Sequence, residues 1–395
     1  MKTQSLKMAF VFTVLAAVGM NFHHPVLPTL FTELGLPARI FGNASAVLCF
    51  FCFITAPFWG EMSNYFGRVK IFTIACILYG CGQFILGRAT TESGVLTARM
   101  ISGLFSEGVS IANLLYIVDQ SKPENRGKNV ALYTAIQTVS SSFGYLFGGF
   151  IGTYWHYNYN FVVQGIWMIS VGACALLIQK ESSIKVAKEK TINLLKKANP
   201  FRTFAKAGSL LNNVTISFFI SVVLTGFAST CYDNAFNYYL KDQLGFIPAY
   251  NGILKASIGI IGLIVNFTIT LWLMKQRNLI KKLTIVLLIC AVSAMLGVID
   301  GGLVYFIIIN LVFFTGIAVF RPVQRSLAIE GRDVHEASLA VGLYNSMMSA
   351  GNVFGGVFAG LVYGYHAQGP FMLAACIFVL AVICNSVYDK RSKEV

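Results

Sequence analysis

The sequence predicts an all-α membrane protein with twelve transmembrane helices in two pseudo-symmetric bundles of six. Of its 395 residues, 56% are apolar and only 12% are charged, whereas ordinary soluble domains contain about 25% charged residues. Apolar stretches of roughly 20 residues, long enough to cross a bilayer, recur to the end of the chain. Lys and Arg are concentrated in alternate connections between these stretches, which is the pattern of the positive-inside rule.

Twelve apolar runs define the predicted spans. They are residues 8–31, 41–61, 69–88, 94–118, 129–153, 160–179, 209–232, 249–274, 282–299, 303–320, 337–363 and 370–388. Basic residues follow the even-numbered spans and occupy both ends of the chain, so both termini are expected in the cytoplasm. The first run is too long for the apolar core of a cleaved signal peptide. We therefore expect a multi-pass protein of the cell (plasma or inner) membrane.

One long basic connection, residues 180–208, separates six spans from six. Its lysines and arginines suit a solvated, partly amphipathic linker on the anionic leaflet of the membrane. The predicted organisation is an N-terminal bundle (1–180), a linker (181–208) and a C-terminal bundle (209–395). Because the net charge of +14 is explained by this placement, no nucleic-acid partner is expected. We expect a monomer that is embedded in the lipid bilayer and binds protons and a small-molecule substrate.

The two halves look like copies of one another. The pattern Gly-x-x-x-Gly-Gly at residues 144–149 recurs at 351–356, and Leu-Gly at 34–35 recurs at 244–245. The two offsets, 207 and 210 residues, nearly agree. Halves with the same topology are expected to be parallel repeats, related by an axis along the membrane normal.

The sequence gives no sign of an enzyme or of a bound cofactor. No nucleophile–base or metal-ligand spacing is present, and no Gly-x-x-x-x-Gly-Lys-Ser/Thr loop for ATP exists. The nine cysteines lie in apolar runs, and Cys49 and Cys52 are interpreted as small packing residues.

Residues 60–70 form a short polar, basic interruption between the second and third spans. Their pattern resembles the loop between the second and third helices of the major facilitator superfamily, a large family of secondary transporters, at Gly60, Gly67, Arg68 and Lys70. In that family an Asp at the position of Asn64 faces a helix N-terminus in the other half and helps to latch the cytoplasmic side. Asn64 can accept a hydrogen bond there but lacks the charge–dipole interaction of about 0.3–1 kcal/mol.

The end of the fourth span provides a partner for this loop. Asp119 is the expected ion-pair partner of Arg68, and Asp-x-x-x-Pro-x-x-Arg-Gly at 119–127 is typical of the family; two unrelated surface charges are the alternative. The resemblance implies a set of gating residues: Gly60, Asn64, Gly67, Arg68, Asp119 and Arg126.

Other motifs are similar to those of bacterial twelve-helix drug:proton antiporters. Pro-x-x-Pro at 25–28 kinks the first span, Arg-x-x-x-Gly at 99–103 resembles a fourth-helix motif linked to proton transfer, and Phe-Arg-Pro at 320–322 ends the tenth span. The fifth span departs from the antiporter pattern, because Ser140 replaces its first Gly and Tyr145 its Pro.

Ionisable side chains inside a membrane are costly and usually functional. The proton-coupling candidates are Asp233, Glu107, His23, His24 and Arg99. In the superfamily the first, fourth, seventh and tenth helices line a central cavity, and all five residues fall on such helices. The 210-residue offset carries His23 onto Asp233, so these two side chains are predicted to face each other.

Alternatives remain for several of these residues. Glu107 could pair structurally with Arg99, and Arg99 could instead extend its guanidinium toward the membrane surface. One of the two adjacent histidines is expected to face helices or lipid headgroups rather than the cavity.

The predicted function is proton-coupled export of small molecules by alternating access, with multidrug efflux as the leading hypothesis. Aromatic and amide side chains are the substrate-binding candidates: Asn21, Tyr116, Tyr232, Asn310, Tyr344 and Asn345. The alternative is a dedicated exporter of a polar or zwitterionic metabolite, such as a metallophore or siderophore. A membrane sensor that does not transport is a third possibility, which would need no titratable groups in a cavity.

Overall fold

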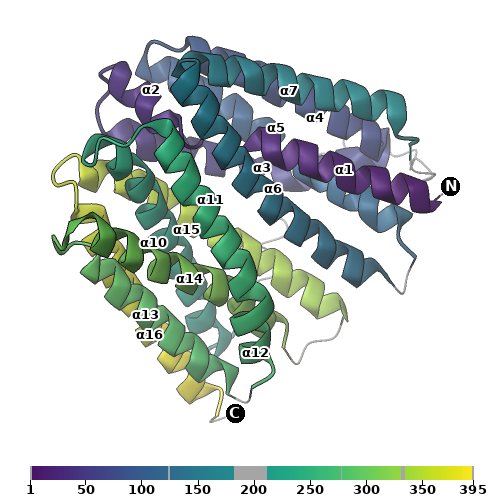
Figure 1. The fold of residues 1–395 in the computed structure, drawn as a ribbon. Helices are drawn as coiled ribbons and strands as arrows, with labels where there is room; N and C mark the ends of the chain where they lie inside the picture. The colour runs from purple at the N-terminus through teal and green to yellow at the C-terminus, as the bar shows by residue number, and fades with distance from the viewer. Residues whose placement is uncertain (1, 123–124, 182–210, 277, 331–333, 394–395) are drawn as a thin grey trace. The chain divides into compact units, whose positions relative to one another are not determined.

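The computed structural model describes the whole chain except residues 1, 123–124, 182–210, 277, 331–333 and 394–395. Every regular element in the described residues is a helix (Figure 1). The helices are α1 (Lys2–Met20), α2 (Leu27–Glu33), α3 (Arg39–Phe66), α4 (Arg68–Arg88), α5 (Glu92–Gln120), α6 (Arg126–Tyr154), α7 (Tyr157–Ile178), α10 (Thr215–Asp242), α11 (Pro248–Val265), a π-helical segment (Asn266–Thr270), α12 (Leu271–Met274), α13 (Leu279–Leu296), α14 (Gly302–Ile329), α15 (Val334–Tyr363) and α16 (Gly369–Arg391).

These helices account for the twelve predicted spans. Nine stretches of helix in the described residues are long and apolar enough to cross a membrane. The other three spans are α1 with α2, which a break divides, and the long helices α6 and α15, which carry more Ser, Thr, Asn and Gly. The twelve-helix membrane fold is therefore confirmed. The predicted linker, 181–208, lies outside the described residues apart from Glu181.

Contacts divide the chain into two units. The first comprises the described residues of Met1–Leu36, Val47–Pro200 and Leu240–Gly259. The second comprises those of Pro37–Ala46, Phe201–Tyr239 and Ile260–Val395. The units follow the predicted halves except at two places, where the first residues of α3 group with the second half and the first part of α11 with the first half.

Helix pairing repeats between the halves. In the first unit α4 packs against α5 and α7, and in the second unit α13 packs against α14 and α16. By order in the chain these are the third, fourth and sixth spans, and the ninth, tenth and twelfth. The apolar core of the first unit lies where α1, α4, α5 and α7 meet, with Phe12, Phe72, Val109 and Met168 among its buried members.

The break in the first span is held by side chains of its neighbours. α1 ends at Met20, residues 21–26 form turns, and α2 begins at Leu27. A broken helix leaves backbone carbonyls without intrahelical partners. In a bilayer only other protein groups can donate hydrogen bonds to these carbonyls. Four side chains do so: Gln164 donates to Gly19 O (2.7 Å), Tyr79 to Met20 O (3.2 Å), Asn160 to Phe22 O (3.0 Å) and Asn251 to Pro25 O (3.4 Å).

Glycines let the fifth span approach the first very closely. A Cβ atom added at Gly144 or Gly148 of α6 would overlap the carbonyl oxygens of Val18 and Phe22, respectively, in the first span. Such contact between backbones is the usual role of small residues spaced four apart in membrane helices.

The second half repeats this contact. A Cβ atom at Gly351 or Gly355 of α15 would overlap the carbonyl oxygens of Val223 and Phe227 of α10. The equivalent contacts support the internal repeat that the sequence predicts.

The same contacts correct the predicted equivalence of His23 and Asp233. Phe22 and Phe227 contact equivalent glycines and lie 205 positions apart, so the counterpart of His23 is Ala228. The 210-residue offset holds only at Gly35 and Gly245, which both have positive φ (60° and 65°). The offset changes because residues 21–26 are turns, whereas α10 stays helical and advances only about 1.5 Å per residue.

Two predicted helix ends are also wrong. α10 runs to Asp242 rather than 232, so that Asp233 lies well inside the helix. α14 continues through Pro322 to Ile329 instead of ending at Phe320–Pro322. A proline is compatible with a membrane helix when its surroundings or a local adjustment satisfy the freed carbonyl.

We predict that Gly148→Ala destabilises the protein. The new methyl group would overlap a backbone carbonyl that cannot move without moving the first span, and overpacking costs about 1–3 kcal/mol. The midpoint of thermal unfolding in detergent should fall. Gly262→Ala is the matched control, because the nearest atom to its added carbon is Ala318 Cβ at 3.5 Å. Equal midpoints for both variants would contradict the packing argument.

Candidate functional site

The loop between α3 and α4 is a tight reversal built around Gly67. Gly67 has φ of 105°, a region that side chains disfavour, and α4 begins at the next residue, Arg68. The three residues that precede it include Asn64, which is exposed. Gly60 lies one turn earlier within α3.

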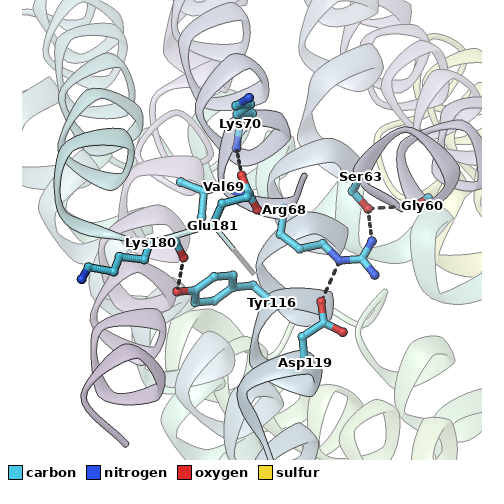
Figure 2. Close-up of polar contacts among 9 residues, drawn as sticks. All are labelled: Gly60, Ser63, Arg68, Val69, Lys70, Tyr116, Asp119, Lys180 and Glu181. Atoms are coloured by element: carbon cyan, nitrogen blue, oxygen red, sulfur yellow. Dashed lines mark hydrogen bonds and ion pairs between the residues drawn. The ribbon is translucent and has the colours of Figure 1, made fainter. Parts of the chain in front are cut away.

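Arg68 connects the ends of three helices (Figure 2). Its Nε donates to Asp119 Oδ2 on α5 at 3.0 Å, and its Nη1 donates to Ser63 Oγ on α3 at 2.7 Å. Ser63 in turn donates to Gly60 O at 2.8 Å. The Arg68 residue is only 5% exposed. The predicted ion pair with Asp119 is thus present, and the flat guanidinium uses two of its nitrogens at once.

Glu181 caps α4 from the end of α7. Its Oε1 accepts from the Val69 amide (3.1 Å) and its Oε2 from the Lys70 amide (3.3 Å), so a carboxylate occupies the N-terminus of the helix (Figure 2). Free amides and the helix dipole both favour an anion at this position. A Cβ atom on Gly67 would lie 2.5 Å from Glu181 Cδ. Glycine is therefore required by the carboxylate as well as by its own φ.

Tyr116 belongs to this end of the first unit. Its hydroxyl donates to Lys180 O at 2.9 Å, next to Glu181. The residue is buried among Ala9, Val69 and Ile117. In this conformation the Tyr116 ring packs at the loop end of α5, and its hydroxyl bonds the chain that leaves α7. A role of Tyr116 in substrate binding stays a prediction.

Sequence reasoning missed Glu181. Glu181 lies 112 positions after Val69, whose amide it accepts from, so no short motif links it to the loop. The available signal was a carboxylate directly after the sixth span beside a helix start that has no acidic residue in its first turn. Arg126, the remaining predicted gating residue, is exposed at the start of α6.

The two histidines occupy the break in the first span. His23 is 2% exposed, and its ring stacks on that of His24 with 4.3 Å between the ring centroids. Gln164 Nε2 lies 3.1 Å from His23 Nδ1. His24 is half-buried and meets Tyr145 edge to face, with centroids 5.3 Å apart. His24 is thus the more accessible of the two.

Arg99 and Glu107 lie on α5 in the same unit. Arg99 is 4% exposed, and Tyr79, Cys49 and Cys52 are its electrostatic neighbours. The alternative that Arg99 reaches the membrane surface is therefore wrong. Arg99 also acts electrostatically on His23.

Glu107 lies two turns along α5 from Arg99. Its carboxyl is half-buried and interacts electrostatically with Cys52 of α3 and Tyr133 of α6. Cys52 Sγ is also 3.0 Å from Ser106 Oγ. The structural pairing of Glu107 with Arg99 stays a prediction.

In the second unit, two substrate-binding candidates contact each other. Tyr232 of α10 donates its hydroxyl to Asn310 Oδ1 of α14 at 2.9 Å, and both residues are 0% exposed. The Tyr232 ring stacks on Phe313 with centroids 3.6 Å apart. In this conformation the pair joins helices and has no surface for a ligand. Asp233, the next residue, is half-buried.

The remaining candidates differ in exposure. Tyr344 is buried, and its hydroxyl donates to Arg321 O (3.1 Å). Asn345 is exposed, so the two neighbours point to different environments. Asn21 donates to Ala17 O (2.7 Å) and to Ser141 Oγ (3.0 Å), which joins the first span to α6. Among the described residues, no group of three or more His, Cys, Asp or Glu side chains could hold a metal ion.

Comparison with known proteins adds a family match. Residues 9–331 match the family model described as Major Facilitator Superfamily. The chain is 19% identical over 379 residues to "Multidrug resistance protein 2" of Bacillus subtilis, covering 96% of this chain and 94% of that protein. It is 23% identical over 379 residues to "Quinolone resistance protein NorA" of Staphylococcus aureus, covering 94% and 93%.

Solved structures share the fold. A bacterial homologue of the human lysosomal transporter Spinster superposes with a TM-score of 0.77 at 16% identity, over 98% of this chain and 96% of that one. The nucleoside transporter NupG superposes with a TM-score of 0.77 at 14% identity, over 98% and 99%.

We predict that Arg68→Lys weakens the loop although it keeps the charge. An ammonium group cannot donate to Asp119 and Ser63 with the same fixed fork, and a hydrogen bond to a charged group contributes about 1.5–3 kcal/mol. The midpoint of thermal unfolding should fall for Arg68→Lys and for Asp119→Asn. Because the two residues form one pair, the double variant should lose less than the sum. Additive losses would show that the pair makes no energetic contribution.

We also predict that Glu181→Gln loosens the start of α4. A neutral amide replaces the two carboxylate oxygens that accept separately from Val69 and Lys70 with a single oxygen, and it carries no charge to balance the helix dipole. Hydrogen exchange at these two amides should accelerate by about two- to tenfold, for a loss of about 0.5–1.5 kcal/mol. Glu61→Gln, at the end of α3, is the control. Unchanged exchange at Val69 and Lys70 would refute the cap.

Proposed function

Since the family match covers most of the chain, the protein belongs to the major facilitator superfamily, and we propose that it is a proton-coupled exporter of small molecules, acting mainly in multidrug efflux. As a member of a transporter superfamily, it is a multi-pass membrane protein and not an enzyme. Superfamily members transport small molecules and typically draw on ion gradients. The finer proposal concerns the ion, the direction and the substrate.

One observation carries the proposal: three ionisable side chains lie inside the membrane-spanning part of the first unit. His23 and Arg99 are almost fully buried, and Glu107 is half-buried. Burying charge in a membrane protein is costly, so such residues are usually kept for ion or proton transfer. Burial also favours the neutral form of a carboxyl or an imidazole. Groups of this kind can exchange protons as their access to water changes.

The names of the sequence relatives support efflux of drugs as the substrate class. Two relatives at 19% and 23% identity are named for multidrug and quinolone resistance, and each is matched over nearly its whole length. Lipophilic cations would suit acidic side chains inside the membrane-spanning part of the protein, such as Asp233 and Glu107. Arginine at 99 and the half-buried His24 are the further groups proposed to take part in proton transfer.

The proposed cycle is alternating access, in which the binding groups are exposed first to one side of the membrane and then to the other. Proton binding at Asp233 or Glu107 favours release of the substrate outward. Each charge that moves down the membrane potential supplies about 2.3 kcal/mol per 100 mV, which permits roughly 50-fold accumulation. The protein is proposed to act as a monomer with both termini in the cytoplasm, because basic residues cluster on that side.

The loop from Gly60 to Lys70 is proposed to gate the cytoplasmic side. The Arg68–Asp119 pair and the Glu181 cap make this loop rigid within its own unit. Asn64, Gly60, Gly67 and Arg126 complete the proposed gating set.

The alternative substrate is a polar or zwitterionic metabolite such as a metallophore. Buried amides favour it as a class, but Asn310 already bonds Tyr232, and Asn21 already bonds Ser141. A sensor without transport would not need the buried His23 and Arg99.

Efflux from everted membrane vesicles distinguishes these possibilities. We expect cationic dyes to be transported only with an imposed pH gradient, and transport to fall at least about tenfold in Asp233→Asn or Glu107→Gln, since each removes a proton-carrying group. Asp300→Asn, an exposed turn residue, is the control. Transport of a metallophore alone would favour the alternative. Equal dye transport with and without the pH gradient would exclude proton coupling.

A further inference from the structure

The amide of Gln164 lies between the break in the first span and His23. Gln164 is 0% exposed on α7, and its Nε2 is 2.7 Å from Gly19 O and 3.1 Å from His23 Nδ1. The amide nitrogen carries two hydrogens, enough for both neighbours.

Gly19 decides which way this amide faces. A backbone carbonyl can only accept a hydrogen bond, so the nitrogen of Gln164 must point toward it. The opposite orientation would set the amide oxygen against the carbonyl oxygen at the same short separation. The nitrogen therefore also faces His23, and His23 Nδ1 must accept.

An imidazole nitrogen that accepts has no proton. His23 is consequently neutral, with its single proton on Nε2. Neither His23 Nε2 nor Gln164 Oε1 has a hydrogen-bond partner in the described part of the chain, although both are buried. The site thus holds an unused donor on the ring and an unused acceptor on the amide.

The charged and titratable groups around the ring come from three directions. His24 stacks on it from the same segment, Arg99 of α5 acts on it electrostatically, and Tyr79 of α4 lies beside the Gln164 amide while it donates to Met20 O. A proton that arrives at His23 must enter next to the fixed positive charge of Arg99.

We propose that Gln164 is a positioning residue that couples the protonation state of His23 to the break in the first span. A proton on Nδ1 would point at the amide hydrogens, so the amide must turn and present its unused Oε1. That turn breaks the hydrogen bond to Gly19 O. Protonated His23 and the Gln164–Gly19 bond therefore exclude one another, and uptake of a proton leaves Gly19 O with only the long bond from the Phe22 amide (3.5 Å).

This inference deepens the proposed function, because it assigns His23 and Gln164 to the response to protons. It differs from a purely structural role for Gln164, which would not depend on the charge of the ring. It also separates the two histidines: the Gln164 amide contacts His23, whereas His24 is half-buried beside Tyr145.

Nitrogen-15 NMR of selectively labelled histidine tests the inference in the full chain, with His23→Gln used to assign the signal. In the wild type near neutral pH, we expect a protonated Nε2 and an unprotonated Nδ1. In Gln164→Glu both nitrogens of His23 should be protonated, because a carboxylate accepts from Nδ1. Gln164→Leu should give a mixture of both neutral tautomers.

Gln83→Leu is the matched control. Gln83 is also 0% exposed, but its amide donates to Ser102 Oγ on α5. This variant loses a buried amide and should leave the His23 signals unchanged. A wild-type Nδ1 that carries the proton would overturn the tautomer assignment without any variant. An unchanged His23 in folded Gln164→Glu would overturn the coupling.

Transport gives a second readout. If His23 responds to protons through Gln164, dye efflux in Gln164→Glu should vary with pH by less than about twofold, whereas Gln83→Leu should keep the wild-type profile. An unaltered profile in Gln164→Glu would also overturn the coupling. If no substrate is transported even by the wild type, the proposed function fails, and the NMR result still decides the fate of the His23–Gln164 pair.

Discussion

The structure depends on one constraint: inside a bilayer every backbone polar group must find its partner in the protein. The first span violates the regular helix between Met20 and Leu27, and four side chains from α4, α7 and α11 satisfy the carbonyls that the break exposes. A break in a membrane helix therefore requires polar side chains in the neighbouring helices. This requirement explains why Asn, Gln and Tyr are buried together in a chain that is otherwise so apolar.

Charged side chains also need protein partners when they are buried, as the loop end of the first unit shows. Arg68 is buried, and its guanidinium donates hydrogen bonds to Asp119 and Ser63. The helix start beside it receives a carboxylate from a different part of the chain. Interactions of this kind join the ends of α3, α4, α5 and α7 and attach the loop to its unit at several points.

Hydropathy and charge placement predicted the twelve helices, because these follow from local pattern and the membrane's thickness. The Arg68–Asp119 pair was predicted from the resemblance of residues 60–70 and 119–127 to the superfamily's motifs. The equivalence of His23 and Asp233 failed, since a fixed offset assumes that both halves are equally regular, and the turns at residues 21–26 break that assumption. The end of α14 was missed because Pro322 is a weaker helix breaker in a membrane than in water. Glu181, Gln164 and Asn160 could not be found from motif spacing, because each bonds backbone groups far away in the chain, and such groups have no residue-type pattern.

The position of the cap on α4 has a practical consequence. Glu181 is the last described residue before 182–210, and its carboxylate belongs energetically to a helix that begins at Arg68. A protease site or fluorescent insert placed before it would separate the acid from its amides. If the polypeptide is divided into two co-expressed fragments, the cut should therefore follow Glu181, so that the first fragment keeps the carboxylate that caps its α4.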